Sequence, residues 1–232
     1  MRQVKLGLLL ALAMLALAAC SGEDAPAIET GAVIATETFD TRGAWEEGTY
    51  PMDAATPDSV LAITDGRYVL AHSAGRAASF TWGVGSETLE DVIIEVEAEQ
   101  LSSDGDNLYG IGCRLNGDSP DSQTGYVFLI SGDGHYGIGE LRNQIITFDG
   151  LLPWRQSGVI HQGAATNTLR AACLGDTLAL TVNGEFLGSA DGSGYRRAGQ
   201  IGFFAGAGAG QSIEVAFDNL TLSEGSVSAV SD

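Results

Sequence analysis

From Thr38 onward, apolar and polar residues alternate with a period of two, and glycine- or asparagine-containing turns interrupt the alternation. Segment 91–99 is the clearest case, because Ile94, Val96 and Ala98 fall on one face and the acidic side chains on the other. No stretch keeps apolar residues at the helical spacing free of glycines. Short strands between such turns predict an all-β fold, an antiparallel two-sheet β-sandwich, with a closed barrel as the alternative.

Turn dipeptides place several strand pairs. Asp65-Gly66 predicts two strands within 61–82, and Asn183-Gly184 predicts a hairpin further along the chain. The Gly132-Asp-Gly134 segment is a third expected turn. The segment 102–107 is also interpreted as a hairpin turn, which would make the strand at 91–99 the neighbour of the strand at 109–115.

The N-terminus carries a targeting pattern. Basic Arg2 and Lys5 precede an apolar run over 6–19 that is too short for a bilayer core, which takes about 20 apolar residues. Residues 17–20, Leu-Ala-Ala-Cys, resemble a bacterial lipobox, which implies a signal peptide over 1–19 and a lipidated Cys20. An ordinary signal peptide with a chance cysteine is the alternative.

Lipidation would place the chain on a bacterial cell envelope, facing the periplasm or the exterior, with its acyl chains in the lipid bilayer. Ser21 in place of Asp favours the outer membrane in a two-membrane cell. Residues 20–37 are small, polar and acidic, and they are predicted to form a flexible tether. The folded domain is expected over 38–223, followed by a disordered tail over 224–232.

The charge balance excludes one class of partner. The chain has 30 acidic residues against 11 Lys and Arg, a net charge of −19. Removing residues 1–19 removes two cations and no acid, which leaves −21. A phosphate backbone requires a basic surface, so no nucleic acid is expected as a partner.

Two cysteines remain if Cys20 is lipidated. Cys113 and Cys173 lie 60 positions apart, and paired thiols are the rule in an oxidising compartment. A disulfide between them is expected to add ~3–4 kcal/mol of stability by the chain-entropy estimate. Two free buried thiols are the alternative.

Several short motifs together resemble one superfamily. They are Phe39-Asp40 with Trp45, Tyr109-Gly110 with Cys113-Arg114, Tyr126-Val-Phe128, Asp133-Gly134 with Tyr136 and Ile138, Asn167 with Leu169, Cys173 with Gly175, Val182-Asn-Gly184, Gly199 with Ile201-Gly202, and Phe217-Asp-Asn219. From about Glu37 to Leu222 the chain resembles the concanavalin A-like lectin/glucanase superfamily, and more closely its bacterial laminin-G-like and keto-glycoside-hydrolase-like jelly rolls. The resemblance implies a jelly roll and supports the disulfide. It implies no single function, because lectins, hydrolases and interaction domains share this scaffold.

A candidate ligand site follows from the expected register. If 102–107 is a hairpin turn, Glu97 lies beside Gly110, Glu95 beside Gly112 and Ile93 beside Arg114. Later hairpins bring His135 to the same face, over a floor of Gly110, Gly112, Gly137 and Gly139. Four glycines inside strands weaken a sheet, so something is expected to approach that floor closely: a ligand, a partner or a covering loop. Strand curvature and simple Glu–Arg pairs are the alternatives.

Glu95-x-Glu97-x-Glu99 resembles the Glu-x-Asp-x-Glu motif of retaining laminarinases and lichenases on this fold. The resemblance implies catalytic roles for Glu95 and Glu99, whose carboxyl groups would need to lie about 5–5.5 Å apart. Glu97 departs from that motif, and the flanking tryptophans are absent. A solvated acidic strand face is the alternative.

Aromatic and acidic residues complete the candidate list. Trp45, Trp82 and Trp154 are candidate sugar platforms, with Trp154 expected in a loop. Calcium is the cofactor to consider, because carboxylates in irregular loops suit its flexible coordination. The candidate ligands are Asp104, Asp106 and Asp118.

These residues favour a membrane-anchored surface lipoprotein that binds an extracellular glycan or another surface partner through Glu95, Glu97, Arg114, His135 and Trp154. The alternatives are a glycoside hydrolase, either retaining and endo-glucanase-like or keto-glycoside-hydrolase-like, and a structural adhesion module.

Overall fold

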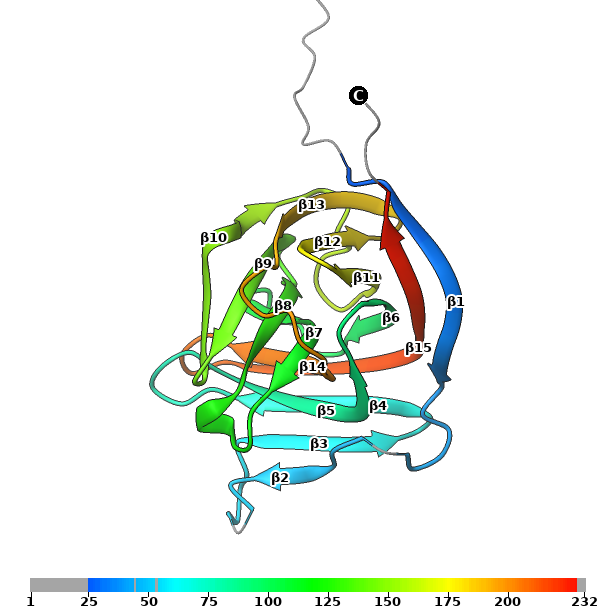
Figure 1. The fold of residues 1–232 in the computed structure, drawn as a ribbon. Helices are drawn as coiled ribbons and strands as arrows, with labels where there is room; N and C mark the ends of the chain where they lie inside the picture. Colours follow the sequence, from blue (N-terminus) through cyan, green and yellow to red (C-terminus); the bar gives the residue numbers. More distant parts are fainter. Residues whose placement is uncertain (1–24, 44, 53, 229–232) are drawn as a thin grey trace, which may run out of the picture.

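The computed structural model describes residues 25–228 except 44 and 53, and it is a sandwich of two antiparallel sheets (Figure 1). The six-stranded sheet has the order β10 (Ile145–Gln156), β9 (His135–Arg142), β8 (Thr124–Ile130), β7 (Asn107–Asn116), β14 (Gly199–Ala207) and β5 (Ser79–Leu89). The nine-stranded sheet has the order β13 (Glu185–Asp191), β12 (Thr177–Val182), β11 (Thr166–Leu174), β6 (Val92–Gln100), β15 (Ser212–Val227), β4 (Arg67–Ser73), β3 (Ser59–Thr64) and β2 (Gly48–Tyr50), with β1 (Ile28–Glu37) paired to β15. The predicted two-sheet sandwich is confirmed, and the barrel alternative is wrong.

The expected turns form where residues can adopt positive φ. Asp65 and Gly66 have φ of 51° and 70° and join β3 to β4, and Asn183 and Gly184, at 51° and 84°, join β12 to β13. Two consecutive positive φ values match the right-handed twist of the flanking strands. Among the described residues, one 3-10 turn, Pro120–Ser122, interrupts the strands. Within the described residues no helix is long and apolar enough to cross a membrane.

The two ends of the domain differ from expectation. Residues 28–37 form β1, which pairs antiparallel with the end of β15, from Glu37 opposite Leu220 to Ile28 opposite Val227. Both strands run along one side of the molecule, and Ile28 and Val227 lie at the same end of it (Figure 1). The predicted domain limits of 38 and 223 are therefore too narrow. The expected tether and tail cannot include 28–37 or 224–227, while Cys20 lies outside the described residues.

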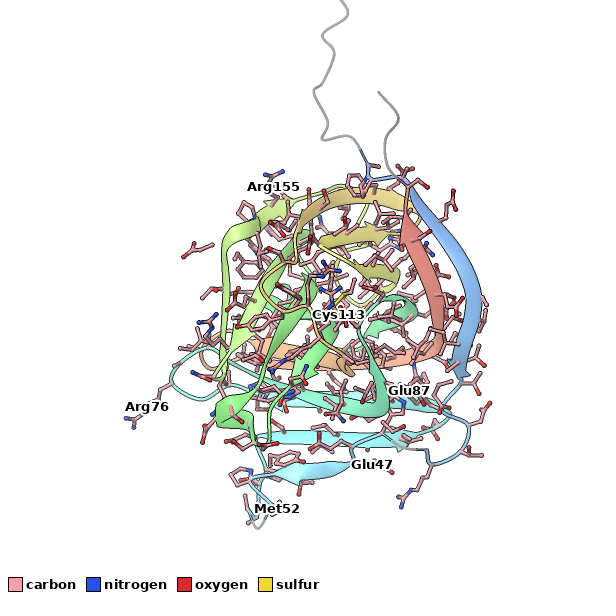
Figure 2. The ribbon with its side chains drawn as sticks, viewed as in Figure 1. Glu47, Met52, Arg76, Glu87, Cys113 and Arg155 are labelled. Carbon is pink, nitrogen blue, oxygen red and sulfur yellow. A yellow bond between two sulfur atoms is a disulfide. The ribbon has the colours of Figure 1, made fainter. Side chains whose placement is uncertain are left out.

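The main core lies between the sheets. Ile94, Val96 and Ala98 of β6 face it as predicted, and Tyr109, Ile111 and Cys113 face it from β7. Cys113 and Cys173 form the predicted disulfide, which joins β7 of one sheet to β11 of the other. Figure 2 places Cys113 among the interior side chains, whereas Met52 and Arg76 project at the periphery. The disulfide thus links the two sheets within the buried core.

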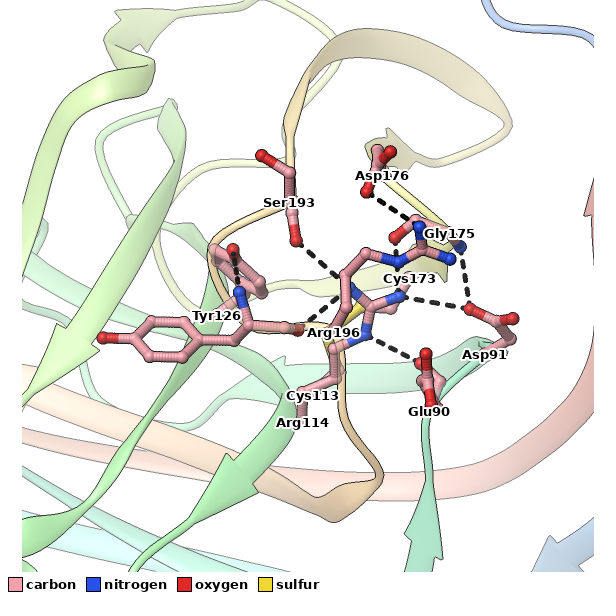
Figure 3. Close-up of polar contacts among 12 residues, drawn as sticks. Glu90, Asp91, Cys113, Arg114, Tyr126, Cys173, Gly175, Asp176, Ser193 and Arg196 are labelled. Atoms are coloured by element: carbon pink, nitrogen blue, oxygen red, sulfur yellow. Dashed lines mark hydrogen bonds and ion pairs between the residues drawn. A yellow bond between two sulfur atoms is a disulfide. The ribbon is translucent and has the colours of Figure 1, made fainter.

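Beside the disulfide, the side chain of Arg114 connects several loops through hydrogen bonds (Figure 3). Its side chain is fully buried, and its φ of 53° breaks the alternation that would otherwise turn it outward. The guanidinium donates to the Asp91 carboxylate at 3.1 Å and to backbone carbonyls of Glu90, Gly175, Gly192 and Tyr195 at 2.8–3.3 Å. These acceptors belong to three different connections, so one buried cation ties three loops together.

The predicted pairing of β6 with β7 is wrong. β6 lies between β11 and β15 in the nine-stranded sheet, and the connection after Gln100 crosses to the other sheet. Consecutive strands are neighbours in roughly two-thirds of cases, and this connection is one of the exceptions. Because β6 lies in the other sheet, none of its acidic residues lies beside the glycine floor.

Candidate functional site: the aromatic face of the six-stranded sheet

Aromatic side chains gather on the outer face of the six-stranded sheet, away from the main core. On β5, Phe80 and Trp82 point outward, while Gly83, the residue after Trp82, faces inward toward Tyr68. Register places Phe204 of β14 beside Trp82, and their rings stack at 6.0 Å between centroids. We define the aromatic face by its outward residues Phe80, Trp82, Leu108, Ile146, Phe148, Trp154 and Phe204.

The glycine floor lies under this aromatic face. Gly110 pairs with Leu129, which pairs with Gly137, and Val127 lies between Gly112 and Gly139 in the same way. The four glycines therefore share one face, as predicted. A Cβ on Gly137 would lie 2.9 and 3.0 Å from the rings of Phe148 and Trp154. The expected close approach is made by the chain's own side chains.

His135 and Trp154 come together at the edge of this face. Trp154 lies within β10, not in a loop as expected, and its ring stacks on His135 at 6.3 Å with an interplanar angle of 4°. His135 Nδ1 lies 2.8 Å from Asp133 Oδ1. Partial burial opposes ionisation of Asp133, but hydrogen bonds from Ser131 and His135 outweigh it and lower the pKa of Asp133. The hydrogen-bonded pair of Asp133 and His135 thus holds its imidazole against Trp154, which is 37% exposed.

Two cavities open beside the aromatic face, with volumes of about 350 and 360 Å³. The first lies between β5 and the β7–β8 connection, and its lining includes Phe80, Trp82, Asp118 and Gln123. The second lies between β5 and β10, and its lining includes Phe80, Phe148 and Trp154. Phe80 lines both. Partly apolar cavities of this size with a few polar groups are typical of small-molecule sites.

The acidic strand faces solvent on the opposite side of the molecule. We define the charged face as the outer surface of the nine-stranded sheet around Glu95, Glu97 and Glu99. Their carboxylates lie 3.6 Å from Arg170, 2.9 Å from Asn219 and 2.6 Å from Arg67, respectively. None of the three glutamates lines either cavity of the aromatic face. The sequence-predicted combination of Glu95, Glu97, Arg114, His135 and Trp154 in one site is therefore wrong, since only His135 and Trp154 meet.

The remaining predicted site residues are separated as well. Arg114 is bound by carbonyls in the interior and is not accessible to a ligand. Asp118 lines the first cavity and Asp106 the second, while the carbonyl of Asp104 accepts hydrogen bonds from Gln100 and Asn107. In residues 25–228, apart from 44 and 53, no group of three or more His, Cys, Asp or Glu side chains is arranged to hold a metal ion. The three aspartates do not form one calcium site.

Sequence reasoning found part of this face. Trp82 and Trp154 were candidate platforms, whereas Trp45 stacks on Phe203 at 4.7 Å and packs against the main core. Phe80 and Phe148 were missed. Phe80-x-Trp82 follows the period-two alternation, so the pair was detectable as an aromatic strand face, but nothing local assigns that face to solvent.

Comparison with known proteins identifies the fold. No protein-family model and no curated protein sequence matches the chain. Among solved structures, the carbohydrate-binding module CBM66 from Bacillus subtilis is similar with a TM-score of 0.60 and 14% identity, over 78% of this chain and 96% of that one. A galectin-like protein from Bacillus subtilis gives a TM-score of 0.62 at 12% identity, over 87% and 100% of the two chains. A β-glucanase from Bacillus licheniformis gives 0.58 at 12%, over 84% and 99%. The chain has the concanavalin A-like jelly-roll fold that these proteins share.

Proposed function

We propose that this protein binds glycan chains at the aromatic face. The observation that carries the proposal is a set of partly exposed aromatic side chains on an outer sheet face. The solvated face of an antiparallel sheet normally carries polar residues. Each Å² of apolar surface left in water costs about 25 cal/mol, so a contiguous apolar surface on an outer sheet face marks an interaction site. Sugar rings have apolar faces and hydroxyl edges, which fit aromatic rings flanked by amide and carboxyl groups.

Two further observations support binding in preference to hydrolysis. The neighbours in fold include a carbohydrate-binding module and glucanases, so the scaffold suits either activity and the site must decide. The candidate catalytic pair, Glu95 and Glu99, lies on the charged face, and each carboxylate is held by an arginine. Neither lines either of the two cavities of the aromatic face.

We also propose that Cys20 anchors the domain to a bacterial membrane, as the lipobox-like residues suggest. Ile28, where β1 begins, lies eight positions after Cys20. At about 3.6 Å per residue that segment reaches roughly 29 Å at most, so the sandwich would stay close to the bilayer. The intact mass of the protein isolated from membranes tests this, and an unmodified N-terminus at another residue would contradict it. An unchanged membrane association of Cys20→Ser would also contradict it.

The binding experiment uses residues 21–232, which contain every described strand of the sandwich. Affinity electrophoresis against soluble polysaccharides should show retardation by at least one of them. Phe80→Ala and Trp82→Ala should remove the retardation, because each deletes a ring of the aromatic face. Glu95→Gln, on the charged face, is the matched control and should be retarded like the parent.

Three results would contradict the proposal: no retardation on any polysaccharide, retardation that survives both aromatic substitutions, or retardation lost in Glu95→Gln. Release of reducing sugar by the parent and not by Glu95→Gln would establish hydrolysis instead. Circular dichroism of each variant shows whether the fold is retained.

A further inference from the structure

The two cavities on either side of Phe80 lie along the same strand, β5. The second cavity meets the start of β5 at Ser79, and the first extends along it to Val84. Because Phe80 contributes to both, an extended ligand that crosses this ring would occupy both cavities at once. We use the word groove for the two cavities with Phe80 between them.

The groove carries negative charge and no positive charge. Glu46 and Asp118 line the first cavity and Asp106 lines the second. Among the described residues that line either cavity, none is a lysine or an arginine. Like charges repel strongly where protein walls displace water, so carboxylated or sulfated sugars are disfavoured at both cavities.

A buried histidine is hydrogen-bonded to two serines, and one serine hydroxyl lies at each cavity. His72 lies between the sheets at 5% exposure, with Nδ1 2.9 Å from Ser59 Oγ and Nε2 2.8 Å from Ser79 Oγ. Ser59 lines the first cavity and Ser79 the second. A neutral imidazole donates at one nitrogen and accepts at the other. One serine is therefore left with an O–H to donate and the other with oxygen lone pairs only.

This arrangement favours a ligand that both donates and accepts. A sugar hydroxyl can do either, whereas an ionised carboxylate or sulfate can only accept. We infer that the groove binds an uncharged glycan chain that spans both cavities across Phe80, and that it discriminates against acidic glycans. The inference rests on the proposed glycan binding at the aromatic face and specifies the class of glycan.

The first test compares soluble neutral polysaccharides, namely β-glucans, mannans and hydroxyethylcellulose, with acidic ones, namely alginate, polygalacturonate and carboxymethylcellulose. Retardation by at least one neutral polymer and by no acidic polymer is expected. Retardation by acidic polymers equal to or stronger than that by neutral ones would overturn the inference and leave glycan binding intact. No retardation by any polymer would contradict the proposed function itself.

A charge variant separates the groove from the overall charge of the protein. Asp118→Asn should raise the ratio of acidic to neutral affinity, because it removes a repelling carboxylate from the first cavity. Glu95→Gln removes the same charge from the charged face and should leave the ratio unchanged. Equal changes in both variants would show that net charge, and not the groove, sets the discrimination.

Chain length tests the span. Oligosaccharides of two to six sugars, prepared from the retained neutral polymer, should bind by calorimetry with an affinity that rises at least tenfold with length. Phe80→Ala should show no measurable binding of any of these oligosaccharides, because the Phe80 ring borders both cavities. A disaccharide that binds as tightly as the hexasaccharide would overturn the span across Phe80.

Discussion

The two outer faces of this sandwich present opposite chemistry on similar backbones. On the charged face, the three glutamates of β6 each contact Arg67, Arg170 or Asn219 and so have a partner within the chain. On the aromatic face, rings lie over glycines and border two cavities. Polar groups that already have hydrogen-bond partners within the chain do not call for a ligand. Exposed apolar surface beside open cavities marks an interaction site. For this reason we propose glycan binding on the aromatic face and not on the charged face, although the acidic strand looked more like a site in the sequence.

The largest effect is expected from the loss of Arg114, whose hydrogen bonds hold three connections between the strands together. Arg114→Met leaves the Asp91 carboxylate and four carbonyls without their buried donor. The Asp91 side chain is half exposed and can be hydrated, so the loss comes mainly from the carbonyls, and a buried acceptor left unpaired costs about 1–3 kcal/mol. Urea denaturation should show a loss of that size, and Arg142→Met, which removes an exposed arginine, should change stability by less than about 1 kcal/mol. A loss below about 1 kcal/mol in Arg114→Met would contradict the role assigned to the buried guanidinium.

The next effect concerns the aromatic face alone. Gly137→Ala places a methyl group where the rings of Phe148 and Trp154 lie, so those rings must shift. Overpacking of this kind costs about 1–3 kcal/mol. The emission spectrum should change, because Trp154 moves, and glycan affinity should fall. Gly158→Ala is the matched control, since a Cβ there meets no atom within 4 Å. The same emission spectrum in the parent and in Gly137→Ala would show that Gly137 does not support the rings.

A smaller effect is expected on the charged face. Glu99→Gln weakens the contact with Arg67, a partly exposed pair worth about 0.2–1 kcal/mol that salt screens. Thermal unfolding at low and high salt should show a small loss that shrinks as salt rises. Glycan binding should be unchanged. A marked loss of binding with the fold retained would return function to the charged face.

The smallest effect is a pH dependence from His72, which lies between the two sheets. Burial lowers its pKa from the ordinary value of 6.5, against the opposing influence of Asp58 and the hydrogen bond of Ser79. The unfolded chain therefore binds a proton at a higher pH than the folded protein. The stability from the neutral ring is complete above pH 6.5 and decreases as the pH falls below it, until the folded pKa is reached. Denaturation at a series of pH values should show this slope, and His72→Asn should reduce it. An identical slope in both proteins would contradict it.

Local features were predictable from the sequence, and pairings over long distances were not. The turns at Asp65-Gly66 and Asn183-Gly184 depend on residues that tolerate positive φ, so the dipeptides alone identify them. The inward face of β6 followed from its alternation. By contrast, β1 was assigned to a tether, because its strand depends on pairing with β15, nearly two hundred residues away.

The candidate site failed at two particular points. The connection after Gln100 joins different sheets, and no residue within it distinguishes such a crossing from a hairpin. Arg114 was assigned to the surface because a charge next to a buried Cys113 normally points outward, but its positive φ turns it inward. Trp82 and Trp154 were found through residue type, since aromatic side chains remain recognisable when the register is misjudged, whereas His135 was placed on the face by the later hairpins.

The three indole N–H groups provide the most direct test of glycan binding at the aromatic face. Trp82 and Trp154 lie on that face, while Trp45 packs against the main core. NMR spectra of the domain should be recorded during titration with oligosaccharides of the retained neutral polymer. We expect the indole signals of Trp82 and Trp154 to shift and the signal of Trp45 to stay in place. Saturable binding that leaves the signals of Trp82 and Trp154 unchanged would contradict it.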